Sequence, residues 1–196
     1  FNPSSTAFMA ARLAVMQVEK PEAKLKHRWV DYSKISSNLK HAVIASEDAK
    51  FMQHQGFDWQ GIENAFKKNV KKGRLVAGGS TITQQLAKNL FLSSKRSLFR
   101  KFEEVIITLM LEQILSKQRI YEIYLNVIEW GDGVFGAEAA ARHYYHKGAY
   151  SLSTTQAAKL AVMVPNPRFY DKHRNTRYLN RRTATIRARL HLVKVP

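Results

Sequence analysis

Three short runs of the sequence combine carboxylates, hydroxyl groups and cations at spacings that could support chemistry. In the first run, Glu47 and Asp48 follow an apolar stripe at Ile35, Leu39 and Val43, whose spacing predicts a helix. A carboxylate at the end of such a stripe is expected to be partly desolvated. Desolvation raises its pKa and makes it a better general base.

Continuation of that helix would place Glu47, Phe51 and His54 on one face, within roughly 60° of one another at about 100° per residue. Gly56 then ends the run. The alternative is a solvated acidic pair followed by a surface histidine. The spacing alone leaves both interpretations open.

The second run, residues 78–89, places two glycines and several hydroxyl residues at a predicted helix start. Thr81 and Gln84 have the spacing of a capping box. Free backbone N–H groups and the helix dipole at such a start suit an anion. Lys88 and Arg96 follow, and two cations near hydroxyls and amides would suit a phosphate or pyrophosphate. The alternative is an ordinary capped helix with solvated cations.

The third run centres on Glu104, which is four residues after Arg100 and three after Lys101. Both cations can reach it on a helix and hold it ionised. A surface ion-pair ladder is the alternative interpretation. Glu112 differs because it continues the apolar stripe of residues 98–109, so it must find a partner or be protonated. We interpret Glu112 as structural.

The elements that position these runs are predicted to be helices. Residues 22–164 contain no proline, and several segments repeat apolar residues at helical period, including residues 59–70, 120–127 and 135–145. The best strand candidates are residues 28–31 and 75–76. The sequence therefore predicts one mainly α domain over residues 1–196, with at most a small β-hairpin.

Composition limits the partners. The chain has 196 residues, no cysteine and a formal charge of +17. Thiolate metal sites and disulfides are excluded, and a polyanionic partner is indicated: nucleic acid, an anionic membrane surface or a phosphorylated substrate. No apolar run reaches the roughly 20 residues of a membrane span. Because the chain starts at Phe1, we expect an N-terminal anchoring segment to have been removed.

Taken together, five motifs resemble the peptidoglycan glycosyltransferases of glycosyltransferase family 51. This domain occurs in bifunctional penicillin-binding proteins and in monofunctional enzymes. In order along the chain, the motifs occupy residues 47–56, 79–89, 100–112, 117–131 and 152–165. No penicillin-binding domain follows them, so the resemblance is to the monofunctional biosynthetic form.

The resemblance implies a bilobal, lysozyme-like α domain whose smaller lobe dips into the bilayer surface. It implies polymerisation of lipid II into glycan strands by inverting transfer of the MurNAc C1 onto the 4-hydroxyl of GlcNAc, with release of undecaprenyl pyrophosphate. The expected location is the outer, periplasmic face of the bacterial cytoplasmic membrane, with one spanning anchor. Lipid II, the growing strand, the anionic membrane surface and cell-wall synthesis proteins are the expected partners, and nucleic acid is not.

The resemblance also assigns residues. Glu47 would be the base and Glu104 a second catalytic carboxylate, held by its neighbouring cations or by a divalent metal, Mg²⁺ or Mn²⁺. The positions expected to bind substrate are Asp48, His54, Ser80, Thr83, Gln84, Gln85, Lys88, Asn89, Arg96, Arg100 and Lys101.

Two residues depart from the family pattern. Gln156 stands where many relatives have Glu, and as the third residue of a capping box it can serve the same backbone N–H. Asn64 stands where bifunctional relatives often carry Arg, which puts one cationic substrate contact in doubt. Two other functions remain open: a lysozyme-like enzyme that cleaves peptidoglycan, and a basic helical protein that binds nucleic acid without catalysis.

Overall fold

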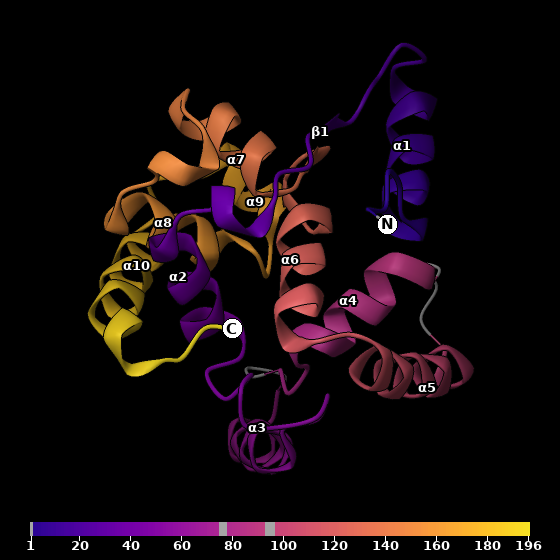
Figure 1. The fold of residues 1–196 in the computed structure, drawn as a ribbon, viewed down its shortest axis with the longest axis vertical. Helices are drawn as coiled ribbons and strands as arrows, with labels where there is room; N and C mark the ends of the chain where they lie inside the picture. The colour runs from indigo at the N-terminus through magenta and orange to yellow at the C-terminus, as the bar shows by residue number, and fades with distance from the viewer. Residues whose placement is uncertain (1, 75–77, 93–96) are drawn as a thin grey trace.

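Helices make up most of the fold, and one small sheet joins them (Figure 1). The structure is a computed structural model that describes residues 2–74, 78–92 and 97–196. The α-helices in these ranges are α1 (Ala7–Glu19), α2 (Ser37–Glu47), α3 (Trp59–Lys72), α4 (Ile82–Phe91), α5 (Leu98–Ile114), α6 (Lys117–Val127), α7 (Ala137–Tyr145), α8 (Thr154–Met163), α9 (Pro167–Lys172) and α10 (Arg177–Arg189). Three short 3₁₀ turns are η1 (Tyr32–Lys34), η2 (Ala149–Ser151) and η3 (Leu190–Leu192). The expectation of a mainly α domain is confirmed.

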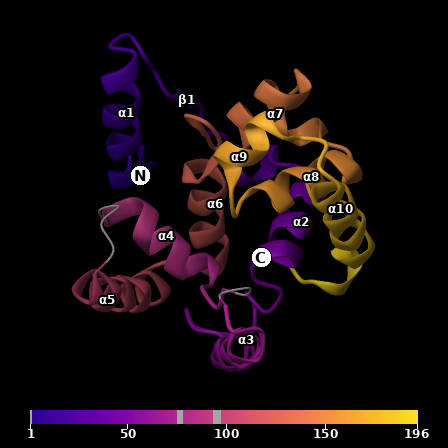
Figure 2. The same ribbon diagram turned by 180° about the vertical axis from the view of Figure 1, so that it is seen from behind.

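The helices pack in two groups. Helix α2 packs against α8 and α10, whereas α4 packs against α1, α5 and α6, and α6 lies between the two groups in both views (Figures 1 and 2). The aromatic rings of Tyr121, Phe51 and Tyr124 are fully buried around α6. The Tyr121 hydroxyl also donates to the backbone oxygen of Lys40 at 2.6 Å, which ties α6 to α2.

The sheet has the strand order β1 (Lys26–His27), β3 (Val134–Phe135), β2 (Glu129–Gly131). Strands β2 and β3 form a small hairpin, and β1 adds to it in parallel. A small hairpin was expected, but the strand candidates were placed elsewhere in the sequence. The predicted strand at residues 28–31 is wrong, because the ladder ends at His27. The backbone of Val30 bonds to the side chain of Asn126 and not to a neighbouring strand. The Val30 N–H donates to Asn126 Oδ1, and Asn126 Nδ2 donates to the Val30 carbonyl oxygen, both at 3.0 Å. The other strand candidate, residues 75–76, lies outside the described residues.

Local signals set most helix starts. The capping boxes Thr81–Gln84 and Ser153–Gln156 both form, so Gln156 does serve the backbone N–H as expected. Glu138, on the first turn of α7, is buried and accepts the Ala149 N–H at 2.7 Å.

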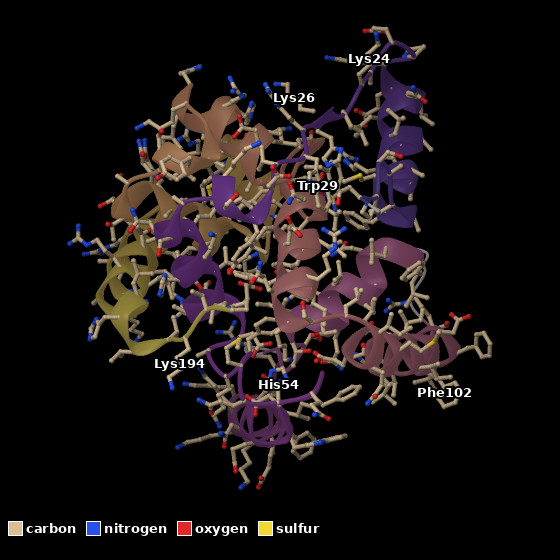
Figure 3. All side chains as sticks on the ribbon, in the orientation of Figure 1. Lys24, Lys26, Trp29, His54, Phe102 and Lys194 are labelled. Atoms are coloured by element: carbon tan, nitrogen blue, oxygen red, sulfur yellow. The ribbon has the colours of Figure 1, made fainter. Side chains whose placement is uncertain are left out.

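The apolar stripes of α3 and α5 face outward. On α5 the side chains of Leu98 and Phe102 are 92% and 63% exposed, while Glu104 and Thr108 lie on the buried face. On α3 the corresponding exposed residues are Trp59, Phe66 and Val70. Figure 3 shows Phe102 pointing away from the body of the protein. These two helices therefore present apolar surface that no other described element covers.

The close approach of the β3–α7 junction to α6 gives a test of the fold. Gly136 has φ +84° and ψ 152°, a conformation that only glycine adopts readily, and a Cβ there would lie 2.6 Å from the Asn126 carbonyl oxygen. We expect Gly136→Ala to lower the free energy of unfolding by more than about 3 kcal/mol, since strain and a backbone clash add. Chemical denaturation measures this.

Gly73 is the matched control. Its φ is +60°, but a Cβ would meet no atom of the described residues within 4 Å. Gly73→Ala should therefore cost only the roughly 1–2 kcal/mol of a left-handed alanine. If Gly136→Ala and Gly73→Ala lower the free energy of unfolding equally, the contact between residue 136 and the Asn126 carbonyl does not constrain the fold.

Candidate active site

A cleft of about 560 Å³ lies among α1, α4, α5, β2 and the segment that leads into α9. Its described lining residues are Phe8, Ser80, Gln85, Lys88, Asn89, Leu92, Arg100, Lys101, Glu104, Ile128, Glu129, Val164, Pro165, Pro167 and Arg168. The second and third sequence runs therefore meet in one cavity, although they lie on different helices.

Glu47 is the last residue of α2 and adjoins this cleft through Gln85. The Gln85 amide nitrogen donates to Glu47 Oε2 at 3.1 Å, and its carbonyl oxygen accepts from the Tyr124 hydroxyl at 2.9 Å. The Ser46 hydroxyl donates to Glu47 Oε1 at 3.3 Å. The carboxylate is thus oriented by a hydrogen-bond chain, and Gln85 separates it from the other residues that line the cleft.

The environment of Glu47 shifts its pKa in the direction that suits a general base. Burial raises the pKa of the Glu47 carboxyl and outweighs the hydrogen bonds from Gln85 and Ser46 and the positive charge of Arg182, which lower it. A carboxylate with a raised pKa binds a proton more readily near neutral pH.

The helix that was expected to carry Glu47, Phe51 and His54 on one face ends at Glu47, so that expectation is wrong. The chain turns at Asp48, which has φ −158°, and Phe51 and His54 lie in the turns that follow. The cause is distant in sequence. Asp48 Oδ2 accepts the backbone N–H of Ile82, at the start of α4, at 3.0 Å, and Oδ1 lies 2.9 Å from His54 Nε2.

The start of α4 is consequently not the open anion site that the glycines and hydroxyls suggested. The Ile82 N–H already binds the protein's own carboxylate, Asp48, and the Gln84 N–H binds Thr81 Oγ1 at 3.2 Å. The positive end of the helix dipole therefore stabilises Asp48 and joins α4 to α2. A ligand in the cleft meets the α4 side chains rather than these amides.

Glu104 is buried, and its two expected partners are in place. Lys101 Nζ contacts Glu104 Oε1, and Arg100 lies 3.7 Å from Oε2. Glu104 is more buried than the members of a surface ion-pair ladder, which are exposed to solvent. The three residues therefore form one charged wall of the cleft.

Glu112 has the structural role that was expected. Its Oε1 accepts from the Thr83 hydroxyl at 2.5 Å and from Lys117 Nζ at 2.8 Å. The Lys117 ammonium group also lies 4.4 Å from the centre of the Phe51 ring. This cluster fastens α4 to the last turns of α5 and to the first residue of α6.

The predicted substrate-binding residues divide into two sets. The residues that line the cleft are Ser80, Gln85, Lys88, Asn89, Arg100 and Lys101. Asp48, His54, Thr83 and Gln84 instead bond within the protein and support the cleft, so direct substrate contact by these four stays a prediction. Arg96 lies outside the described residues.

Sequence reasoning missed Glu129, Arg168 and Arg182. Glu129 has a visible signal, since it is the one carboxylate in the apolar run of residues 127–130. Arg168 and Arg182 have none, because they resemble the other cations of the basic C-terminal segment. The structure brings the first two into the cleft and places Arg182 close enough to influence Glu47.

The bond between Asp48 and α4 can be tested by substitution. Asp48→Asn keeps the size of the side chain but replaces one acceptor with a donor that faces Ile82 N–H or His54. We expect the free energy of unfolding to fall by about 1–3 kcal/mol in urea denaturation, because a buried group is left unsatisfied.

Asp58→Asn is the control. Asp58 caps α3 by accepting one N–H, from Gly61, and asparagine caps a helix about as well as aspartate. If Asp48→Asn and Asp58→Asn have the same free energy of unfolding, Asp48 does not hold α2 and α4 together.

Comparisons with known proteins identify the family of the chain. The sequence profile described as transglycosylase matches residues 14–191. A curated protein of Methylobacillus flagellatus named biosynthetic peptidoglycan transglycosylase is 64% identical over 195 residues, covering 100% of this chain and 85% of the relative. Proteins with the same name in Laribacter hongkongensis and Chromobacterium violaceum are 63% and 64% identical over 195 residues, covering 100% of this chain and 86% of each relative. The chain therefore belongs to the transglycosylase family.

Proposed function

We propose that this enzyme polymerises lipid II into the glycan strands of peptidoglycan. The observation that carries the proposal is a base of raised pKa, Glu47, held by Gln85 at the wall of a cleft lined with cations. The names of the relatives, biosynthetic peptidoglycan transglycosylases, support this substrate class.

In the proposed reaction, Glu47 takes the proton from the 4-hydroxyl of the acceptor GlcNAc. The hydroxyl oxygen attacks C1 of the donor MurNAc, the bond from C1 to the pyrophosphate oxygen breaks, and undecaprenyl pyrophosphate leaves. The configuration at C1 inverts. Gln85 contributes by fixing the carboxylate orientation, since its own amide is fixed by Tyr124.

The leaving pyrophosphate needs positive charge where negative charge develops. Lys88, Arg100 and Lys101 line the cleft and are opposed there by Glu104. We assign this side of the cleft to the pyrophosphate and Glu104 to the placement of its two cations. Arg96, expected to grip the same group, remains part of the proposal from its sequence position alone.

A divalent cation belongs to the proposal in a limited way. Among the described residues, no three His, Asp or Glu side chains come together as a metal site. Mg²⁺ is often held by one or two carboxylates plus substrate phosphates. Glu104 is the residue that could share Mg²⁺ or Mn²⁺ with the pyrophosphate, and the cation would supply further charge neutralisation.

The two other functions fit less well. A hydrolase protonates a sugar leaving group with a carboxylic acid and needs no cluster of cations, but Lys88, Arg100 and Lys101 all line this cleft. A nucleic-acid binder would account for the charge of +17, but it requires no buried carboxylate beside a cleft.

We further propose that the enzyme works at the outer face of the cytoplasmic membrane. The exposed apolar faces of α3 and α5 would enter the bilayer surface, and Lys194 lies toward the same end of the molecule (Figure 3). Helix α1 points its N-terminal end toward α4 and α5 and its C-terminal end away from them (Figure 1). Within the described ranges, no helix is both long enough and apolar enough to cross a bilayer.

Replacement of the base tests the function. Glu47→Gln should keep the fold and lower polymerisation of labelled lipid II, followed on a denaturing gel, by about 10²–10⁴-fold, because an amide cannot take the proton. A folded variant that retains more than about a tenth of the rate would show that Glu47 is not the base. The unmodified enzyme must first make long strands from lipid II, and fragments released from finished wall would instead indicate a hydrolase.

Liposome binding tests the membrane face. Leu98→Ser with Phe102→Ser should weaken co-sedimentation with phosphatidylglycerol vesicles more than about tenfold, since each side chain loses roughly 1.5–3 kcal/mol of apolar burial. Binding should also fall with salt and rise with phosphatidylglycerol content.

The matched control is Val15→Ser with Val18→Ser, two exposed apolar residues on α1. Equal effects of the two double substitutions would contradict the assignment of the membrane face to α5.

A further inference from the structure

The proposed reaction leaves one buried carboxylate of the cleft without a role. Glu129, at the start of β2, is 6% exposed and lines the cleft. Its Oε1 accepts the Gly133 N–H at 3.2 Å, and burial raises the pKa of its carboxyl despite the nearby guanidinium groups of Arg168 and Arg12. Burial of a charged carboxylate is costly unless partners compensate it, and Glu129 has two arginines and one backbone N–H around it.

The two arginines differ in what else they bind. Arg12 of α1 lies 3.6 Å from Glu129 Oε1 and also pairs with Asp132. Arg168 of α9 lies 3.6 Å from Glu129 Oε2 through Nε, and its side chain is 54% exposed. Among the described residues, Glu129 is the only acidic partner of Arg168. The terminal nitrogens of Arg168 are therefore left to meet a ligand in the cleft.

Charge divides the cleft into two sides. Among the described lining residues, the side formed by α4 and α5, here called the α5 side, has three cations, Lys88, Arg100 and Lys101, against one acid, Glu104, which gives these residues a formal charge of +2. The α9 side has one cation and one acid, Arg168 and Glu129, and is formally neutral. In both views α5 and α9 lie on different sides of α6 (Figures 1 and 2).

The segment that leads into α9 adds apolar lining residues, Val164, Pro165 and Pro167, and Ile128 precedes Glu129 in the lining. A neutral polar pair beside apolar surface suits a sugar, which offers hydroxyl and acetamido oxygens at its edge and C–H groups on its faces. It does not suit a diphosphate, which the +2 side attracts more strongly.

We infer that Arg168 donates hydrogen bonds to the sugar part of the substrate strand, and that Glu129 is the positioning residue that holds Arg168 in place. The inference rests on the proposed function, since it deepens the assignment of that cleft. Arg12 completes the arrangement by joining α1, and with it Phe8, to the same carboxylate.

Two half-substrates separate the two sides of the cleft. One probe is a tetrasaccharide of alternating GlcNAc and MurNAc without pyrophosphate, and the other is farnesyl pyrophosphate without sugar. By isothermal titration calorimetry, Arg168→Ala should weaken tetrasaccharide binding about tenfold or more and change farnesyl pyrophosphate binding by less than about twofold. Lys88→Ala should weaken farnesyl pyrophosphate binding about tenfold or more and change tetrasaccharide binding by less than about twofold.

Arg142→Ala is a matched control. Arg142 is also 54% exposed and pairs through Nε with a buried glutamate, Glu138, but it lies outside the cleft. It should leave both affinities unchanged. The inference is overturned if Arg168→Ala binds the tetrasaccharide as Arg142→Ala does, if both probes weaken together, or if the unmodified enzyme binds no tetrasaccharide.

The positioning role has its own readout. Glu129→Gln should weaken tetrasaccharide binding, and adding it to Arg168→Ala should cause no further loss, because Glu129 acts through Arg168. Additive losses, or weakened farnesyl pyrophosphate binding in Glu129→Gln, would show a merely structural role. Lipid II polymerisation by the unmodified enzyme is measured separately, so failure of the proposed function and failure of this subsite are distinguishable.

Discussion

The hydrogen bond from the Ile82 N–H to the Asp48 carboxylate is the constraint on which the arrangement of the site depends. It fixes the end of α2 against the start of α4. This contact places Gln85, on the first turn of α4, where its amide nitrogen can donate to Glu47. The hydroxyl of Tyr124, on α6, donates to the amide oxygen of Gln85. The Glu47 carboxylate is thus oriented by the contact between the two helix ends, and the dipole of α4 stabilises Asp48, the carboxylate that joins them.

The proposed substrate has two parts, a pyrophosphate and a glycan strand, that need differently charged surfaces. A leaving pyrophosphate needs excess positive charge, while a growing glycan strand needs hydrogen-bond donors without strong attraction for phosphate. The α5 side carries the excess and the α9 side is balanced by Glu129. A cation on the α9 side without its acid would compete for the pyrophosphate and hold the substrate in the wrong register.

Features that depend on neighbours in sequence could be predicted. The capping boxes and the pairing of Glu104 with Arg100 and Lys101 follow from spacings of three and four residues. The end of α2 could not be predicted, because the partner of Asp48 is 34 residues further along the chain. Glu129 stands out in the sequence as a carboxylate in an apolar run, but its pairing with Arg168 could not be predicted for the same reason. The stripes on α3 and α5 predicted helices, but periodicity does not say what covers an apolar face, and here no described element does.

On the proposed membrane face, helix α5 would connect the chemistry to the membrane. One of its faces supplies Arg100, Lys101 and Glu104 to the cleft, and another exposes Leu98 and Phe102. If the exposed face rests in the bilayer surface, the cations lie about one helix diameter, roughly 10 Å, from the apolar boundary. The pyrophosphate of a lipid-linked sugar is held close to that boundary by its polyprenyl chain. The same helix can therefore set the depth of the protein in the membrane and the position of the leaving group, so the glycan must extend away from the bilayer, toward the side of the cleft formed by α9.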